Sequence, residues 1–163
     1  MSTALGKTGE VPVNGASPEK ERWTPLIVAF CCNWCSYAGG DLAGTSRMDY
    51  PANVKVIRMP CSSRINPLFI LRAFQRGADG VLVAGCHPGD CHYTSGNYYV
   101  RRNLSLFRRL LEFSGIEPER FQVSWISASE GDKFAGVMQS LTEEIKALGP
   151  NGKWRDSRWQ SVE

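Results

Sequence analysis

The chain has 163 residues, of which 42% are hydrophobic and 21% are charged, and its formal net charge is +3 at pH 7. The length suits one domain, and the composition is that of an average soluble protein, which excludes a mostly disordered chain and a collagen-like repeat. The longest apolar run, from Leu26 to Cys32, is far shorter than the roughly 18 residues of a membrane-spanning helix. We therefore expect no membrane insertion.

Cysteine is the residue type that departs most from the average. All six copies fall within one part of the chain: Cys31, Cys32, Cys35, Cys61, Cys86 and Cys91. Residues 1–22 are polar and carry both charge signs, so they lack the apolar core of a secretory signal, and we expect a cytoplasmic protein. In that reducing compartment, clustered cysteines bind metals or carry out redox chemistry more often than they form disulfides.

Short apolar runs alternate along the chain with stretches of helical periodicity. The predicted strands are 26–30, 54–59, 81–85 and 122–126. Helices are predicted from about Gly40, from Pro67 to Gly77, up to Gly115, and from Ser129 to Gly149. The alternation predicts an α/β fold, namely a single flavodoxin-like (Rossmann-like) three-layer domain over 23–149 with about four parallel strands. A flexible polar lead (1–22) precedes this domain, and a tail (150–163) follows it.

The cysteines follow the first three predicted strands. The first loop carries Cys31, Cys32 and Cys35, the second carries Cys61, and the third carries Cys86 and Cys91. In a flavodoxin-like strand order, the first strand lies between the second and the third, so these loops meet at the carboxyl edge of the sheet. That edge is where open parallel sheets bind ligands. The sequence therefore predicts one site that brings all six sulfurs together.

Converging thiolates suit an iron–sulfur cluster, a structural zinc or a dithiol redox site. Zinc sites usually combine two C-x₂₋₄-C pairs, whereas here one C-x-x-C (Cys32, Cys35) is accompanied by a lone cysteine and a wider pair. The spacing favours an iron–sulfur cluster and leaves the other two kinds of site open. The only histidines, His87 and His92, adjoin loop cysteines; we favour hydrogen bonding to cluster sulfur over ligation or simple loop contacts.

The glycine-rich stretch 39–46 has the spacing of a phosphate-binding loop without its chemistry. Thr45 stands where that loop requires lysine, and Asp41 would repel phosphate. The chain also lacks a Ser-His-Asp grouping, a paired-carboxylate site and an H-E-x-x-H motif. We therefore expect a redox centre without catalytic residues of its own.

Residues 30–48 (FCCNWCSYAGGDLAGTSRM) resemble the delta (iron–sulfur) subunit of the methyl-viologen-reducing, F420-non-reducing [NiFe]-hydrogenase. Three further stretches resemble the same family, namely 58–67 (RMPCSSRINP), 77–98 (GADGVLVAGCHPGDCHYTSGNY) and 125–133 (WISASEGDK). The resemblance covers about residues 25–150.

This resemblance implies an electron-transfer subunit that carries one [2Fe–2S] cluster. The subunit would relay single electrons from a hydrogenase, a formate dehydrogenase or a similar donor. The acceptor would be the flavin-containing A subunit of heterodisulfide reductase, which performs electron bifurcation. A zinc-stabilised scaffold subunit of a redox complex is the alternative.

The resemblance also implies roles for single residues. Relatives carry an aliphatic residue at the position of Cys31, which makes Cys31 the spare thiol. Four ligands would then come from five candidates: Cys32, Cys35, Cys61, Cys86 and Cys91. The residues expected around the cluster are Asn33, Trp34, His87 and His92. The family pattern has glycine where Ser63 stands.

Two groups of residues are candidates for contacts with partner subunits. They are Trp154 and Trp159 in the tail, and Arg101 and Arg102 in a predicted helix. Tryptophan and arginine are enriched at interface hot spots, although a run of charges is often only a solvated helix face. The net charge is too small to suggest nucleic-acid binding.

Overall fold

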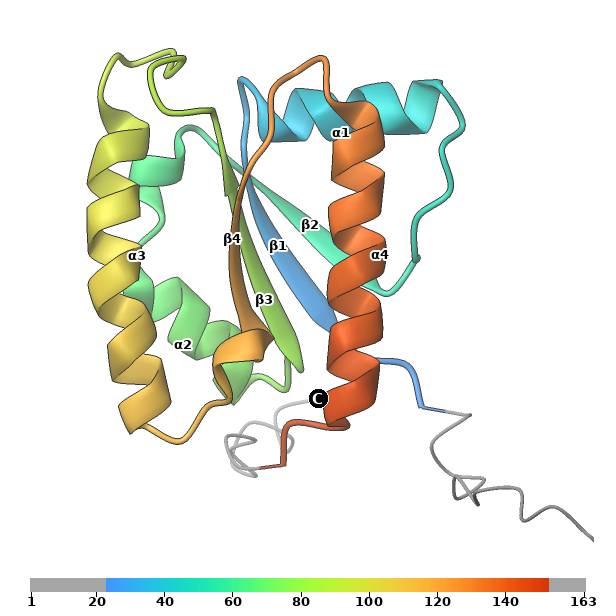
Figure 1. Cartoon of the computed structure of the whole chain (residues 1–163), viewed down its shortest axis with the longest axis vertical. Helices are drawn as coiled ribbons and strands as arrows, with labels where there is room; N and C mark the ends of the chain where they lie inside the picture. Colours follow the sequence, from blue (N-terminus) through green and yellow to red (C-terminus); the bar gives the residue numbers. More distant parts are fainter. Residues whose placement is uncertain (1–22, 153–163) are drawn as a thin grey trace, which may run out of the picture.

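In the computed structural model, which describes residues 23–152, four parallel strands form a sheet in the order β2-β1-β3-β4 (Figure 1). The strands are β1 (Ile27–Cys32), β2 (Val54–Met59), β3 (Gly80–Gly85) and β4 (Phe121–Trp125). The predicted α/β class, the flavodoxin-like architecture and the central position of the first strand are confirmed.

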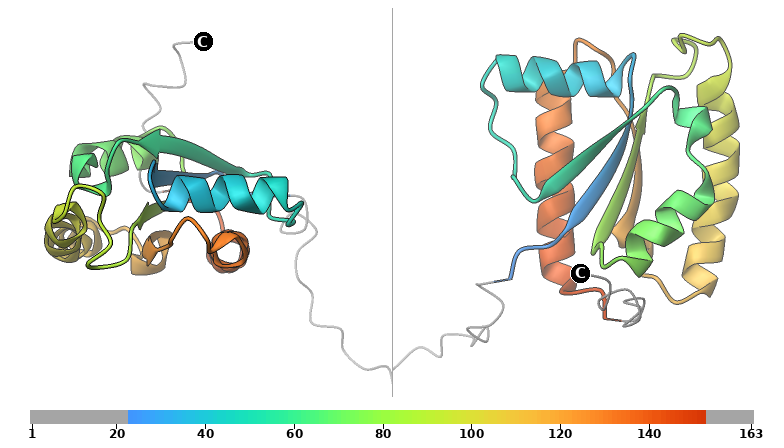
Figure 2. Two further views of the ribbon diagram at one scale, coloured as in Figure 1. Left: turned by 90° about the horizontal axis from the view of Figure 1, so that it is seen from above. Right: turned by 180° about the vertical axis from the view of Figure 1, so that it is seen from behind.

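Two layers of helices cover the sheet, as the view from above shows (Figure 2). The helices are α1 (Ser36–Thr45), α2 (Pro67–Gln75), α3 (Gly96–Phe113) and α4 (Gly131–Leu148), with 3₁₀ turns η1 (Ser62–Arg64) and η2 (Pro118–Arg120). Helices α1 and α4 lie on one face, and α2 and α3 lie on the other (Figure 1). Within the described residues, no helix is long and apolar enough to span a membrane.

The alternation of side chains along β1 supplies both cores. Ile27, Ala29 and Cys31 pack with residues of α1 and α4, whereas Phe30 packs with residues of α2 and α3. Strand β3 is buried along its whole length, which is typical of a parallel strand covered on both faces.

Strand β1 is longer than the sequence predicts. The prediction ends the strand at Phe30, but Cys31 and Cys32 continue the ladder opposite Arg58 and Met59 of β2. These two cysteines therefore belong to the strand rather than to the loop after it. Because successive side chains of a strand point to opposite faces, Cys31 and Cys32 point away from each other.

The first helix begins at Ser36, earlier than the predicted start near Gly40. The buried Ser36 hydroxyl donates a hydrogen bond to the Ala84 carbonyl at 2.8 Å and lies 3.3 Å from the Cys32 carbonyl. These contacts tie the first turn of α1 to the ends of β1 and β3. Only residues 33–35 connect β1 to α1.

Asp79 fastens the opposite edge of the sheet. Its buried carboxylate accepts hydrogen bonds from the backbone N–H groups of Leu26 and Asn151, both at 2.9 Å. The Asp79 carbonyl accepts a further bond from the guanidinium of buried Arg120. One residue thus joins the chain before β1 to the segment after α4.

We expect Asp79→Ala to lower the free energy of unfolding by about 2–4 kcal/mol, because it leaves two backbone N–H groups without their acceptor. Urea denaturation followed by circular dichroism measures this change. Asp41→Ala, on the exposed face of α1, is the matched control and should change stability by less than about 0.5 kcal/mol. Equal effects of the two substitutions would contradict the assigned role of Asp79.

Candidate metal centre

The loops after β1, β2 and β3 meet at the carboxyl edge of the sheet, at the top of Figure 1. With the last residue of β1, these loops bring together five of the six cysteines: Cys32, Cys35, Cys61, Cys86 and Cys91. All five are free thiols, and every one except the partly exposed Cys35 is buried. The predicted convergence at this edge therefore holds for five of the six.

The sulfurs form two neighbouring groups. In the first, Cys32 Sγ lies 3.6 Å from Cys86 Sγ, and Cys35 is also hydrogen-bonded to Cys86. In the second, Cys61 Sγ and Cys91 Sγ both lie within 3.2 Å of the point that a Cβ on Gly96 would occupy. Gly96 is the first residue of α3, and any side chain at this position would occupy the space next to these two sulfurs.

Cys32 is the thiol of this group that most readily ionises. The Cys86 thiol, which donates to its sulfur, has the largest effect, and the backbone N–H groups of Trp34, Cys35 and Ser62 add to it. Against the opposing effect of burial, these donors lower the pKa of Cys32 to about 6. The same hydrogen bond raises the pKa of Cys86, so the shared proton resides on Cys86.

Cys31 lies apart from the other five cysteines. It is fully buried in the core between the sheet and helices α1 and α4, among Ala43, Ala84 and Phe134. Burial raises the pKa of its thiol to about 12, so it stays protonated. The expectation that all six sulfurs share one site is wrong, because the pleat of β1 turns this side chain away.

Polar groups surround the two sulfur groups. The Ser63 hydroxyl donates to Cys61 Sγ at 3.3 Å. The side-chain amide of buried Asn97 donates to the carbonyls of Cys86, at 3.4 Å, and of His87. The Ser62 hydroxyl is buried and has no hydrogen-bond partner among the described residues. Asn97 thus holds the loop backbone at Cys86 and His87, whereas Ser63 contacts the sulfur of Cys61 itself.

The four residues expected around a cluster lie in these loops, but no described contact joins a histidine ring to sulfur. His87 Nε2 lies 2.7 Å from the Glu130 carboxylate, which also accepts the Ser127 N–H. This backbone bond and His87 lower the pKa of Glu130 to about 2. His92 stacks on Trp34 with 3.7 Å between ring centroids, and the backbone N–H of Asn33 bonds to the Met59 carbonyl.

Iron–sulfur clusters and structural zinc both take thiol ligands from proteins. The five thiols supply that type of ligand, and Gly96 leaves space beside Cys61 and Cys91. Within residues 23–152, no three His, Cys, Asp or Glu side chains are arranged tightly enough to hold a single metal ion. Cys32, Cys35, Cys61, Cys86 and Cys91 remain the residues that could bind metal.

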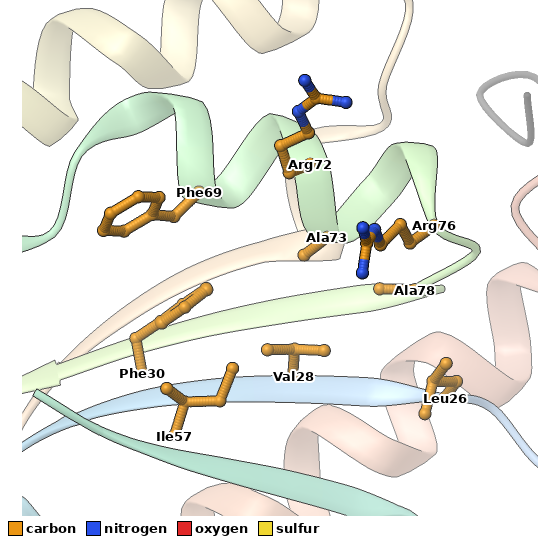
Figure 3. Close-up of a pocket in the computed structure, with 9 residues that line it drawn as sticks. All are labelled: Leu26, Val28, Phe30, Ile57, Phe69, Arg72, Ala73, Arg76 and Ala78. Atoms are coloured by element: carbon orange, nitrogen blue, oxygen red, sulfur yellow. The ribbon is translucent and has the colours of Figure 1, made fainter. Parts of the chain in front are cut away.

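A groove, separate from the cysteines, lies on the face of the sheet that α2 covers. This apolar groove of about 540 Å³ runs between α2 and the sheet, from Leu26 and Ala78 to Phe30 and Phe69 (Figure 3). Of the described residues, no cysteine, histidine or carboxylate lines it. The groove could therefore accept an apolar surface, but it has no metal ligands among its described lining residues. Its charged side chains are Arg72 and Arg76.

Residues 27–149 match the family described as methyl-viologen-reducing hydrogenase, delta subunit. The chain belongs to this family. The match includes all six cysteines and every element of the sheet.

Two relatives in this family are similar to the chain over most of their own length. The iron-sulfur D subunit of the vhc F420-non-reducing hydrogenase of Methanococcus voltae is 55% identical over 130 residues, which are 80% of this chain and 90% of that protein. The iron-sulfur D subunit of the F420-non-reducing hydrogenase of Archaeoglobus profundus is 54% identical over 130 residues, 80% of this chain and 95% of that protein.

A third relative is much longer than this chain. The A subunit of the ferredoxin:CoB-CoM heterodisulfide reductase of Methanosarcina mazei is 45% identical over 140 residues, which are 86% of this chain but only 18% of that protein. The delta-subunit sequence therefore occurs both as a separate chain and as part of a larger polypeptide.

Sequence reasoning missed Gly96, Asn97 and Glu130. Gly96 follows Ser95 at the start of a helix, where no turn requires a glycine. A glycine at such a position indicates close packing, and this was the signal available in the sequence. Asn97 and Glu130 give no comparable signal, because their roles depend on carbonyls and a histidine in a loop that only the fold brings close.

We expect Gly96→Ala to destabilise the chain by about 1–3 kcal/mol, because the new Cβ would lie 2.6 Å from Cys61 Sγ and 3.2 Å from Cys91 Sγ. Gly136→Ala is the matched control, since no described atom lies within 4 Å of its Cβ position on the exposed side of α4. That change should stabilise the chain by up to about 1 kcal/mol. Urea denaturation measures both, and stabilisation by both would contradict the close packing at Gly96.

Proposed function

We propose that the chain is an electron-transfer subunit that holds one [2Fe–2S] cluster between the loops after β1, β2 and β3. The observation that carries this proposal is the convergence of five thiols from the end of β1 and three loops, with the sixth thiol turned into the core. Four of Cys32, Cys35, Cys61, Cys86 and Cys91 would be the ligands, and Cys31 the spare. The family's iron–sulfur subunit names support an iron–sulfur cofactor.

The grouping of the sulfurs supports a cluster with two irons. Such a cluster takes four cysteines, two on each iron. Cys32, Cys35 and Cys86 form one group and Cys61 and Cys91 the other, so each group has enough thiols for one iron. Since the cluster needs four ligands and five thiols are present, one thiol of the first group would not bind iron.

The bound cluster would accept and release one electron at a time, and the surrounding residues would set its reduction potential. Backbone N–H groups of Trp34, Cys35 and Ser62 point at the Cys32 sulfur, and Ser63 donates to the Cys61 sulfur. Hydrogen bonds to cluster sulfurs stabilise the added negative charge and raise the reduction potential. Burial of the thiols keeps water from the site.

The proposed electron acceptor is a heterodisulfide reductase A subunit, and the proposed donor is a hydrogenase. The relatives named as hydrogenase subunits support the donor. The Methanosarcina protein supports the acceptor, because there a similar segment is covalently part of a heterodisulfide reductase A subunit. Electron bifurcation would belong to the acceptor, and a formate dehydrogenase or similar enzyme is a further proposed donor.

A dithiol oxidoreductase is the alternative that one observation favours, since the low pKa of Cys32 is typical of reactive thiols. Cys32 is, however, only 1% exposed, so a substrate disulfide has no access to its sulfur. This alternative also gives no role to Cys61 and Cys91. A metal-bound thiolate explains both the stabilised charge and the burial.

The predicted contacts with partner subunits involve two regions of the chain. The tail residues Trp154 and Trp159 lie outside the described residues. Arg101 and Arg102 are exposed on α3, where a partner could reach them. A docking role for these four side chains is part of the proposal, as is a cytoplasmic location.

The first test of the proposed function is the metal content of the chain. Purified without oxygen, it should be brown and contain about two iron and two acid-labile sulfide per chain. Reduction with dithionite should give the electron paramagnetic resonance signal of a single [2Fe–2S]⁺ centre. A colourless chain that holds one zinc and unfolds on chelation would instead indicate the zinc-stabilised scaffold.

The second test uses single substitutions of the cysteines. Cys31→Ala should leave iron and sulfide content unchanged, since its sulfur lies in the core away from the other thiols. Cys61→Ala and Cys91→Ala should each reduce the content at least severalfold, because their group has no spare thiol. Metal analysis and the visible spectrum give both results, and full loss of iron in Cys31→Ala would contradict the proposed ligand set.

A further inference from the structure

A hollow of about 330 Å³ opens to solvent among residues that neighbour the cysteines along the chain. It is lined by Asn33, Trp34, Arg58, Pro60 and Tyr93. Three of the loops described above contribute to it, together with the end of β2. The hollow is thus part of the carboxyl edge and not of the apolar groove beside α2.

The lining residues are neighbours of the cysteines along the chain. Asn33 and Trp34 fill the space between Cys32 and Cys35, Pro60 directly precedes Cys61, and Tyr93 follows Cys91 by two residues. A protein seated in this hollow would therefore rest on residues that lie within two positions of four of the five clustered thiols along the chain.

Aromatic rings dominate this surface and are fixed by one another. Trp34 is 43% exposed although it stacks on His92, and its indole N–H donates to the Tyr93 hydroxyl at 3.3 Å. His92 also meets Tyr93 edge to face, with 5.0 Å between centroids. The three rings form a rigid exposed unit, the aromatic triad, that requires little ordering when a partner binds.

Arginine completes the hollow. The Arg58 guanidinium lies 5.4 Å from the centre of the Tyr37 ring, at the exposed end of β2. Exposed tryptophan, tyrosine and arginine side chains around a depression are the residues that dominate binding at protein interfaces.

We propose that this aromatic triad and hollow are the docking surface for the heterodisulfide reductase A subunit, which takes electrons there. The inference rests on the proposed function and names the contact through which it operates. In the Methanosarcina relative the two parts share one polypeptide, so their association is permanent. Permanent interfaces are built more from apolar and aromatic side chains than transient ones, which matches the triad.

The apolar groove beside α2 is the competing surface. Phe69 on its rim is 45% exposed and stacks on Phe30, so it resembles Trp34 in exposure and in having an aromatic neighbour. It lines no part of the hollow at the cysteines. Phe69→Ala is therefore the matched control for Trp34→Ala.

We expect Trp34→Ala to weaken, by about thirtyfold or more, the binding of the cluster-loaded chain to the A subunit, which is the effect of an interface hot spot. Phe69→Ala should change the affinity by less than about threefold. Biolayer interferometry under anaerobic conditions measures both affinities, and iron content is determined for each variant. Unchanged affinity in an iron-loaded Trp34→Ala variant, or the larger loss in Phe69→Ala, overturns the proposal.

A second experiment avoids any loss of the cluster through the substitution of Trp34. Tyr93, which is 52% exposed, is replaced by the photo-crosslinking residue p-benzoylphenylalanine in the otherwise native chain, and Phe69 is replaced in the same way as the control. Irradiation of the assembled complex should join position 93, and not position 69, to the A subunit. Absence of that crosslink at position 93 overturns the proposed surface.

These outcomes are distinct from failure of the proposed function. A native chain that carries no [2Fe–2S] cluster, or fails to bind the A subunit, contradicts the function itself. A native chain that carries the cluster and binds the A subunit, but is insensitive to changes at Trp34 and Tyr93, contradicts only the docking surface.

Discussion

The pairing of β1 with both β2 and β3 is the constraint on which the cysteine site depends. Parallel strands end at the same edge of a sheet, so the loops after these three adjacent strands lie next to one another. Thiols separated by as much as 54 residues, such as Cys32 and Cys86, thereby come within 3.6 Å. A strand order in which β1 did not lie beside β3 would separate Cys32 from Cys86.

The same strand decides which thiols can take part. Cys31 and Cys32 are adjacent in sequence, yet the pleat directs one into the core beside α4 and the other toward Cys86. Burial raises the pKa of Cys31 to about 12, whereas hydrogen-bond donors lower the pKa of Cys32 to about 6. Of these two cysteines, only Cys32 readily forms a thiolate. Its side chain lies on the face of β1 where the proposed iron centre would take a negatively charged sulfur as ligand.

Alternating apolar runs and helical periodicity predict the strands and helices, and the flavodoxin-like order assumed for them predicts the edge of the sheet that carries the cysteines. The end of β1 could not be predicted, because the cysteines at 31 and 32 fit a strand or a loop equally well until their ladder with Arg58 and Met59 is known. Because side chains alternate along a strand, the extension of β1 through Cys32 turns Cys31 into the core, and its sulfur does not join the other five. The pairing of His87 with Glu130 was likewise hidden, since it joins loops 43 residues apart.

Gly96 links the packing of the fold to the chemistry of the site. Helix α3 begins against η1, and only a residue without a side chain lets its first turn approach Cys61, Cys91 and Ser63 this closely. The approach closes the site on the side of α3, whereas the residues of the aromatic triad are exposed. A cluster held there would be shielded by the backbone of α3, and a partner docked on the proposed surface would meet it past Trp34 and Tyr93. The same close packing that buries the sulfurs therefore restricts where a partner can meet them.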